Sequence, residues 1–272
     1  MYLQKIQTAK PGLVVMLLDD SSSMKDHLSG TTDERFRWVE RYTGLIFKEL
    51  LARSNEVRGD RAVIKPRYYI YTIIYGSQPK VWPDKATEEL DIEQVIQAYA
   101  NVAQDGGSQN SLGLGGHMHG TNARAAFEKT QEFLATAITK DRFKDSFPPM
   151  VFHLTDAESQ TDAGPSAEQI KQLATSDGNA LIVNALIGTS TSLNYKGPDD
   201  FPGYQTEAEA GPGKDSITLF RMSSEAPETI RKNLVDDGIF PQLGQGARLF
   251  FDVRTREMLK HVLQLVGSQG SR

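Results

Sequence analysis

The chain contains no cysteine, and its apolar runs are short. Without cysteine there can be neither a disulfide nor a thiolate metal site, and such a composition fits a reducing compartment. A membrane-spanning helix needs about 18 consecutive apolar residues, and no run in this sequence approaches that length. The first residues, Met1 to Gln7, lack the apolar core of a secretory signal peptide. We therefore expect a cytoplasmic protein that is not inserted in a membrane.

Basic charge is scarcer than acidic charge. Thirty Lys and Arg residues stand against 35 Asp and Glu residues, which gives a net charge of −5. Nucleic acids and anionic membranes attract basic surfaces, so this balance favours neither as a partner. Several enzyme motifs are missing as well. The sequence has no Gly-x-x-x-x-Gly-Lys phosphate loop, no Gly-x-Ser-x-Gly nucleophile turn and no His-Glu-x-x-His zinc helix.

The sequence does contain a regular alternation of apolar, strand-like runs and amphipathic, helix-like segments. Strands are expected at 13–18, 67–75, 151–156, 180–187 and 248–253, and helices at 33–53, 92–100, 123–138, 166–175, 226–235 and 255–266. Strands that alternate with helices pair in parallel through right-handed crossovers. We therefore predict an α/β fold, with three layers and a doubly wound, mostly parallel sheet flanked by helices.

Three further segments are less regular. Residues 80–82 predict a short antiparallel edge strand, 217–220 another short strand, and 55–65 a polar connection. No repeat or linker divides the chain, so we expect a single domain over 1–272 with its core at about 13–266. Residues 189–215 hold four glycines and three prolines, which predicts an insertion. Such an insertion is either a surface embellishment or a partner-binding loop.

A cluster of carboxylates and hydroxyls follows the first predicted strand directly. Its sequence is Asp19-Asp20-Ser21-Ser22-Ser23, with Asp19, Ser21 and Ser23 spaced as Asp-x-Ser-x-Ser. Mg²⁺ prefers oxygen ligands in octahedral geometry, and few of these ligands need to be charged. Taken alone, such a turn is equally typical of the start of a helix.

Two later segments favour the metal-binding interpretation. Gly120-Thr121-Asn122 follows a glycine-rich loop and opens the predicted helix 123–138, and the strand 151–156 ends in Thr155-Asp156. In an open α/β sheet, the loops that follow the carboxyl ends of neighbouring strands converge on one crevice. We therefore expect the Asp19 turn, Thr121 and Asp156 to lie on a single rim.

These three segments, in this order, resemble the metal-ion-dependent adhesion site of von Willebrand factor type A (vWA) domains, and the resemblance covers about 13–266. It implies that hydroxyls and carboxylates together bind Mg²⁺, or alternatively Mn²⁺ or Ca²⁺. It also implies an open coordination position for an acidic side chain of a protein partner. The implied metal ligands are Asp19, Ser21, Ser23, Thr121 and Asp156.

The segment 14–75 looks closest to stand-alone bacterial vWA proteins of the tellurite-resistance type. The resemblance implies an adaptor or regulatory subunit for a Ser/Thr kinase and phosphatase system or a MoxR-type AAA+ ATPase. The alternative is a metal-dependent hydrolase that uses the Asp19 turn. Phosphatases of the haloacid dehalogenase type have a second Asp two positions after the first, and this chain has Ser21 two positions after Asp19. We therefore expect a protein that is not an enzyme.

Other polar residues near these segments are less suited to bind the metal. Asp20, Glu158 and Asp162 are expected to face solvent or the far side of the sheet, as loop carboxylates usually do. The pair His117 and His119 would suit Zn²⁺, but without Cys or Glu beside it a polar loop is favoured. His153 lies within an apolar strand, which predicts a hydrogen-bonded core residue.

Overall fold

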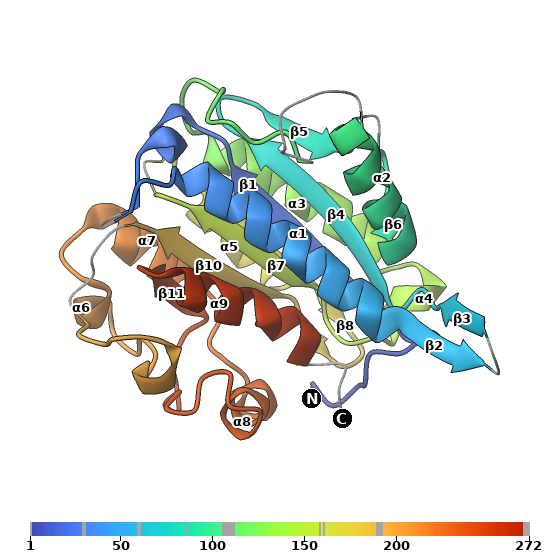
Figure 1. The fold of residues 1–272 in the computed structure, drawn as a ribbon. Helices are drawn as coiled ribbons and strands as arrows, with labels where there is room; N and C mark the ends of the chain where they lie inside the picture. Colours follow the sequence, from blue (N-terminus) through green and yellow to red (C-terminus); the bar gives the residue numbers. More distant parts are fainter. Residues whose placement is uncertain are drawn as a thin grey trace.

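The computed structural model describes residues 2–28, 31–58, 61–84, 86–104, 112–157, 159, 161–188 and 193–268. Its centre is a sheet with helices on both faces (Figure 1). In spatial order the main strands are β11 (Phe250–Val253), β10 (Leu181–Ile187), β7 (Met150–Thr155), β1 (Gly12–Asp19), β4 (Tyr68–Tyr75) and β5 (Pro79–Trp82). All neighbours pair in parallel except β5, which runs antiparallel to β4. The predicted fold class, including the antiparallel edge strand, is confirmed.

The strands are buried on both faces, which explains their continuous apolar sequences. Every residue of β1, β7 and β10 is buried. Alternate residues of β1 pack into two separate hydrophobic clusters, because successive side chains of a strand point to opposite faces. The short strand β6 (Leu90–Asp91) pairs antiparallel with the start of β4.

The helices form the outer layers. One face carries α1 (Arg35–Ser54), α2 (Ile92–Gln104) and α9 (Arg256–Ser268), and the other carries α3 (Ala123–Ala137) and α5 (Gly164–Ile170). The helix α7 (Lys214–Met222) lies next to α5 and β10. Shorter or more peripheral helices are α4 (Asp141–Lys144), α6 (Glu207–Ala210), α8 (Glu228–Asp236), and the 3₁₀ turns η1 (Ser22–Lys25) and η2 (Pro198–Asp200).

Three segments differ from the sequence-based expectation. Residues 55–65 contain a hairpin of β2 (Asn55–Arg58) and β3 (Arg61–Ile64), not an unstructured connection. Residues 217–220 lie within α7 and not in a strand, because the buried residues of α7 follow helical spacing. The helix predicted at 166–175 ends at Ile170, and a small hairpin of β8 (Ala174–Thr175) and β9 (Gly178–Asn179) follows.

The described part of the predicted insertion contributes to the core. Phe201 and Tyr204 are fully buried, and the Phe201 ring contacts those of Phe240 and Phe251 at 5.6 and 5.5 Å between centroids. The segment is therefore anchored against β11.

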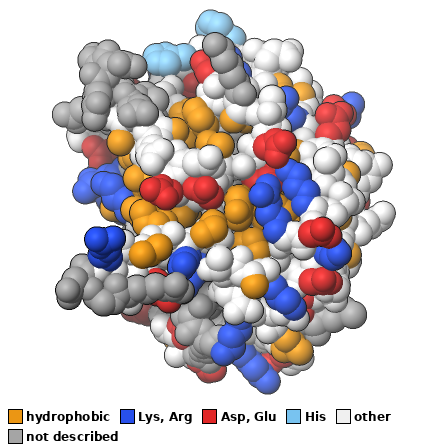
Figure 2. All heavy atoms as spheres, turned by 90° about the vertical axis from the view of Figure 1, so that its right-hand side faces the viewer, with side chains coloured by type: hydrophobic (Ala, Val, Ile, Leu, Met, Phe, Trp, Pro, Cys, Tyr) orange, Lys and Arg blue, Asp and Glu red, His pale blue; other side chains and the backbone are white. Residues whose placement is uncertain are grey.

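The face shown in Figure 2 carries acidic and basic side chains interspersed with hydrophobic ones. Its described part offers no continuous basic surface of the kind that nucleic acids require. Among the described residues, no helix combines the length and the apolar composition of a membrane span.

The order of the strands marks one position in the sheet. The chain moves outward from β1 through β4 to β5, and then returns to build β7, β10 and β11 on the other side. The direction of winding therefore reverses between β1 and β7. In sheets of this kind, ligands bind at the carboxyl ends of the strands beside this reversal. We call the carboxyl ends of β1, β4, β7 and β10, with the loops that follow them, the carboxyl edge.

Candidate metal site

The two acids of the predicted site flank the reversal point of the sheet. Asp19 is the last residue of β1, and Asp156 directly follows β7, the neighbouring parallel strand. Asp19 is fully buried, and the side chain of Asp156 has no exposed surface. Two buried carboxylates thus lie on adjacent strands, where a cation would offset their mutual repulsion.

The carboxylate of Asp19 is held by two hydrogen bonds. Oδ1 accepts from the backbone N of Ser21 at 2.9 Å, and Oδ2 accepts from the hydroxyl of Thr155 at 2.6 Å. Burial raises the pKa of Asp19 to about 6, the bonds from Thr155 and Ser21 oppose this rise, and the nearby charge of Asp156 adds to it. The fold therefore disfavours the ionised form of Asp19 unless positive charge is supplied.

The serines of the motif lie in the turn that follows. The chain bends through η1, where Met24 is fully buried and anchors the turn in the core. This bend places the hydroxyls of Ser21 and Ser23 3.1 Å apart. Ser21 is buried and Ser23 is half-buried. Two hydroxyl oxygens are thus presented side by side, immediately after the carboxylate of Asp19.

Thr121 reaches the same edge through a loop that is bonded to both β1 and β4. The backbone N of Met118 donates to the carbonyl of Asp20 at 3.1 Å, and that of Asn122 donates to the carbonyl of Gly76 at 2.7 Å. Thr121 is 4% exposed between these two anchors. The side chain of Asn122 accepts a hydrogen bond from Ala125 N at 3.1 Å and so caps α3.

One carboxylate oxygen of Asp156 is buried without a bonding partner in the part of the chain that the structure describes. Oδ2 of Asp156 accepts from Arg35 Nη1 at 2.8 Å, whereas its Oδ1 is buried and has no hydrogen-bond partner among the described residues. A buried carboxylate oxygen without a partner is costly. A hard divalent cation bound to this oxygen would remove that cost, so the residues present fit a metal.

All five predicted ligands therefore lie along the carboxyl edge, although their binding of a metal stays a prediction. Within the described residues, no group of three or more His, Cys, Asp or Glu side chains gathers as a metal site. The candidate set accordingly depends on hydroxyl oxygens as much as on acids, a composition that suits hard divalent cations such as Mg²⁺, Mn²⁺ or Ca²⁺.

Asp20 does not face solvent. Its side chain is 3% exposed, and its Oδ1 accepts hydrogen bonds from the backbone N of Gly115 and of Gly116, both at 2.7 Å. A second buried acid, Glu40 of α1, accepts from Leu112 N at 2.6 Å. These two carboxylates fix the loop that leads to Thr121. The sequence signal for Glu40 was an acid on the apolar face of a predicted helix.

The other candidates are exposed or fall outside the described residues. Asp162 is exposed and accepts from Gly164 N at 2.9 Å, and His117 and His119 are exposed. Glu158 falls outside the described residues. The prediction of a core role for His153 is confirmed.

His153 forms a buried polar network beneath the candidate site. Its Nε2 lies 2.6 Å from the hydroxyl of Tyr75, and its Nδ1 lies 2.8 Å from Oδ1 of Asn184. The amide of Asn184 donates to the carbonyl of Leu219 and to the hydroxyl of Ser223, so its Oδ1 accepts. His153 therefore carries its proton on Nδ1 and accepts from Tyr75. Burial lowers the pKa of His153 to about 4, which keeps the ring neutral.

No family model and no curated protein matches the sequence, but solved structures do. Proximal thread matrix protein 1 of the mussel byssus, with a zinc-occupied MIDAS motif, is 12% identical over 97% of this chain and 48% of its own, with a TM-score of 0.47. BatB of Bacteroides thetaiotaomicron is 12% identical over 96% of this chain and 100% of its own, with a TM-score of 0.49. A von Willebrand factor type A structure from Catenulispora acidiphila is 14% identical over 65% and 33%, with a TM-score of 0.43.

The chain thus spans about half the length of the mussel protein that it matches. All three TM-scores lie below 0.5, so these similarities carry no argument about function. Function has to be argued from the strand order and the chemistry of the carboxyl edge.

Proposed function

We propose that this chain is a divalent-metal-dependent protein interaction module of the vWA type. Its metal would be held at the carboxyl edge and would bind a carboxylate of a partner protein. The observation that carries this proposal is Asp156 Oδ1, a buried carboxylate oxygen without a partner, beside a second buried acid at the reversal point of the sheet. The ligands would be Asp19, Ser21, Ser23, Thr121 and Asp156.

The metal that suits this set best is Mg²⁺, with Mn²⁺ or Ca²⁺ as substitutes. All five proposed ligands offer oxygen, and only Asp19 and Asp156 can be charged. Hydroxyls add no negative charge, so Asp19 and Asp156 alone balance the ion, and the ion can still accept an outside carboxylate as a further ligand. The chain's own residues hold and orient the ion, and a carboxylate completes its coordination.

We propose a binding role and not a hydrolytic one. Both oxygens of Asp19 already accept hydrogen bonds, from Ser21 N and from Thr155 Oγ1. Asp19 is also fully buried, and Ser21 stands where a phosphatase of the haloacid dehalogenase type has its second Asp, so we assign Asp19 no nucleophilic role. A product formed from phosphoester substrates only when Mg²⁺ is present would contradict this assignment.

For the biological setting we propose an adaptor or regulatory subunit in the bacterial cytoplasm. The sequence resemblance of 14–75 to tellurite-resistance-type proteins supports this setting. The partner would be a Ser/Thr kinase or phosphatase system, or a MoxR-type AAA+ ATPase, that presents an acidic side chain to the metal.

The test is calorimetric titration of Mg²⁺ and Mn²⁺ into protein freed of metal with EDTA. The wild type should bind about one equivalent, as expected for a single site, and Asp19→Ala should lose that binding. Asp162→Ala is the matched control, because Asp162 is an exposed acid that bonds Gly164. Equal binding by wild type and Asp19→Ala would refute the site.

A further inference from the structure

Arg35 places a cation inside the candidate metal site. It is the first residue of α1, and its Nη1 lies 2.8 Å from Asp156 Oδ2 and 3.8 Å from Asp26 Oδ2. The side chain of Arg35 is only 15% exposed, and that of Asp156 is not exposed at all. Asp26, by contrast, is 65% exposed and is screened by water. The ion pair of Arg35 with Asp156 is therefore stronger than its ion pair with Asp26.

The position of Arg35 is fixed by packing as well as by charge. Its side chain lies against Gly188, just after β10, where an added Cβ would come within 2.9 Å of Arg35 Nε. The backbone N of Arg35 also donates to the carbonyl of Asp26 at 3.0 Å. The guanidinium is thus held at the carboxyl edge, next to a proposed metal ligand.

A fixed cation changes the charge that the site presents. Asp19 and Asp156 together cancel the charge of a divalent ion, so the site without Arg35 would be neutral when loaded. Arg35 adds one positive charge to this balance. The carboxylate of Asp20 lies at the same edge, but its Oδ1 is turned toward the backbone amides of Gly115 and Gly116, from which it accepts hydrogen bonds.

We propose that Arg35 determines specificity by weakening metal binding while strengthening the attraction of the loaded site for carboxylates. This inference rests on the metal-dependent binding proposed above. Guanidinium and metal repel each other across Asp156, which lowers metal affinity. Both attract an incoming carboxylate, for which a guanidinium is a well-matched donor.

The first measurement is a titration with Mn²⁺, in which electron paramagnetic resonance reports the free ion. Arg35→Gln should bind Mn²⁺ about tenfold more tightly than wild type, because the like charge is gone. Arg35→Lys should stay near wild type, because it keeps the charge. Arg37→Gln is the matched control, since Arg37 is 60% exposed on the same helix and pairs with Glu34. Thermal melting confirms that each variant is folded.

The second measurement titrates acetate, the simplest carboxylate, into the Mn²⁺-loaded proteins. Relaxation of water protons reports how much acetate displaces water from the metal. The half-saturating acetate concentration should be about fivefold higher for Arg35→Gln than for wild type and Arg37→Gln.

The outcomes separate this inference from the proposed function. Mn²⁺ binding that depends on Asp19 but is unchanged or weaker in Arg35→Gln would refute the role of Arg35 alone. Acetate affinity unchanged by Arg35→Gln would also refute it. Mn²⁺ binding that Asp19→Ala leaves intact, or none in any variant, would refute the proposed site itself.

Discussion

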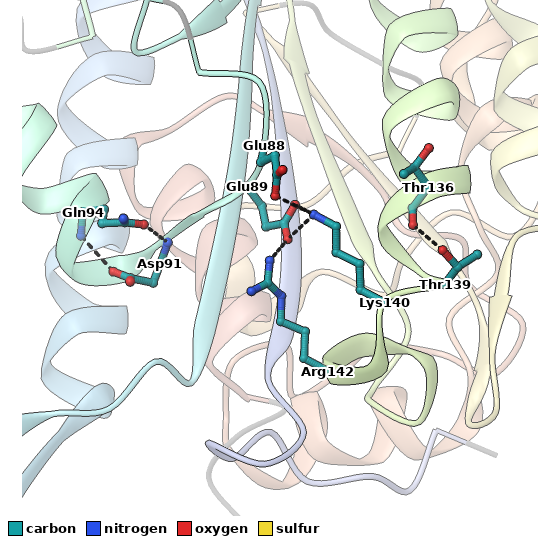
Figure 3. Close-up of polar contacts among 8 residues, drawn as sticks. All are labelled: Glu88, Glu89, Asp91, Gln94, Thr136, Thr139, Lys140 and Arg142. Atoms are coloured by element: carbon teal, nitrogen blue, oxygen red, sulfur yellow. Dashed lines mark hydrogen bonds and ion pairs between the residues drawn. The ribbon is translucent and has the colours of Figure 1, made fainter.

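Glu89 and Asp156 are both acids with side chains that are completely removed from solvent, but their surroundings differ. Glu89 lies before β6, near the amino-terminal end of β4, and Asp156 lies at the carboxyl edge. As Figure 3 shows, Lys140 and Arg142 converge on Glu89. Lys140 Nζ lies 2.9 and 3.0 Å from its two oxygens, and Arg142 donates to Oε1. Asp156 receives one bond, from Arg35, and its other oxygen has none.

Glu89 and Asp156 differ in how many of their carboxylate oxygens have a bonding partner. Where a buried carboxylate has a structural role, the chain supplies partners for it, which are cations at Glu89 and backbone amides at Asp20. Leaving one oxygen of a buried acid without a partner lowers stability. Such a cost is typical of functional sites, where an outside ligand supplies the missing contact.

Removing the satisfied acid should have the largest effect on stability. Glu89→Gln would leave Lys140 and Arg142 facing a buried amide, and we expect the free energy of unfolding to fall by about 3 kcal/mol. Lys140 and Arg142 are 28% and 39% exposed and can turn partly to water. The expected loss therefore lies at the lower end of the range of about 3–5 kcal/mol for breaking a buried ion pair. Urea denaturation measures the loss, and metal affinity should not change.

Glu88→Gln is the control for this variant. Glu88 also bonds Lys140, at 2.9 Å, but is 68% exposed, so the unfolding midpoint should hardly move. If Glu89→Gln were no less stable than Glu88→Gln, the view that burial makes the Glu89 cluster structural would be wrong.

A second prediction concerns His153, which is buried and has hydrogen-bond partners for both ring nitrogens, Tyr75 and Asn184. Its pKa is about 4 in the folded chain, against an ordinary 6.5. Between these values the unfolded chain binds a proton that the folded chain does not, so stability falls as pH decreases. From pH 7 to pH 5 the loss attributable to His153 should be about 2 kcal/mol.

The measurement compares urea denaturation of wild type and His153→Gln at several pH values. Asp19 contributes with the opposite sign near the same pH, because its pKa is raised. That contribution is present in both proteins and cancels in their difference. A difference that stays constant between pH 7 and pH 5 would show that His153 is protonated within the fold.

Much of the fold and of the site's location could be predicted from local sequence. The runs at β1 and β7 are continuously apolar because both faces are covered, and each ends in an acid. Parallel pairing then requires Asp19 and Asp156 to lie together. The prediction for 217–220 failed because a short apolar run fits a strand or one stripe of a helix equally well.

The charge balance of the site could not be predicted in the same way. Arg35 and Asp156 are 121 positions apart, and only the tertiary packing of the start of α1 near the end of β7 brings them together. Asp20 was expected to point away because neighbours alternate in a strand. It does not face solvent, because it is buried and accepts hydrogen bonds from the amides of Gly115 and Gly116, 95 and 96 positions away.

The smallest expected effect tests whether an acid of the candidate site, unlike Glu89, lowers the stability of the fold. Asp19 is the acid to substitute. Asp19 has a raised pKa, so its ionised form destabilises the folded chain above pH 6. In EDTA at pH 7.5, Asp19→Asn should therefore be more stable than wild type, by about 1 kcal/mol once the altered bond to Thr155 is allowed for. Saturating Mg²⁺ should raise the unfolding midpoint of wild type and leave that of the variant unchanged. A variant that is less stable than wild type in EDTA would place Asp19 with Glu89, as an acid that the fold needs for its own stability.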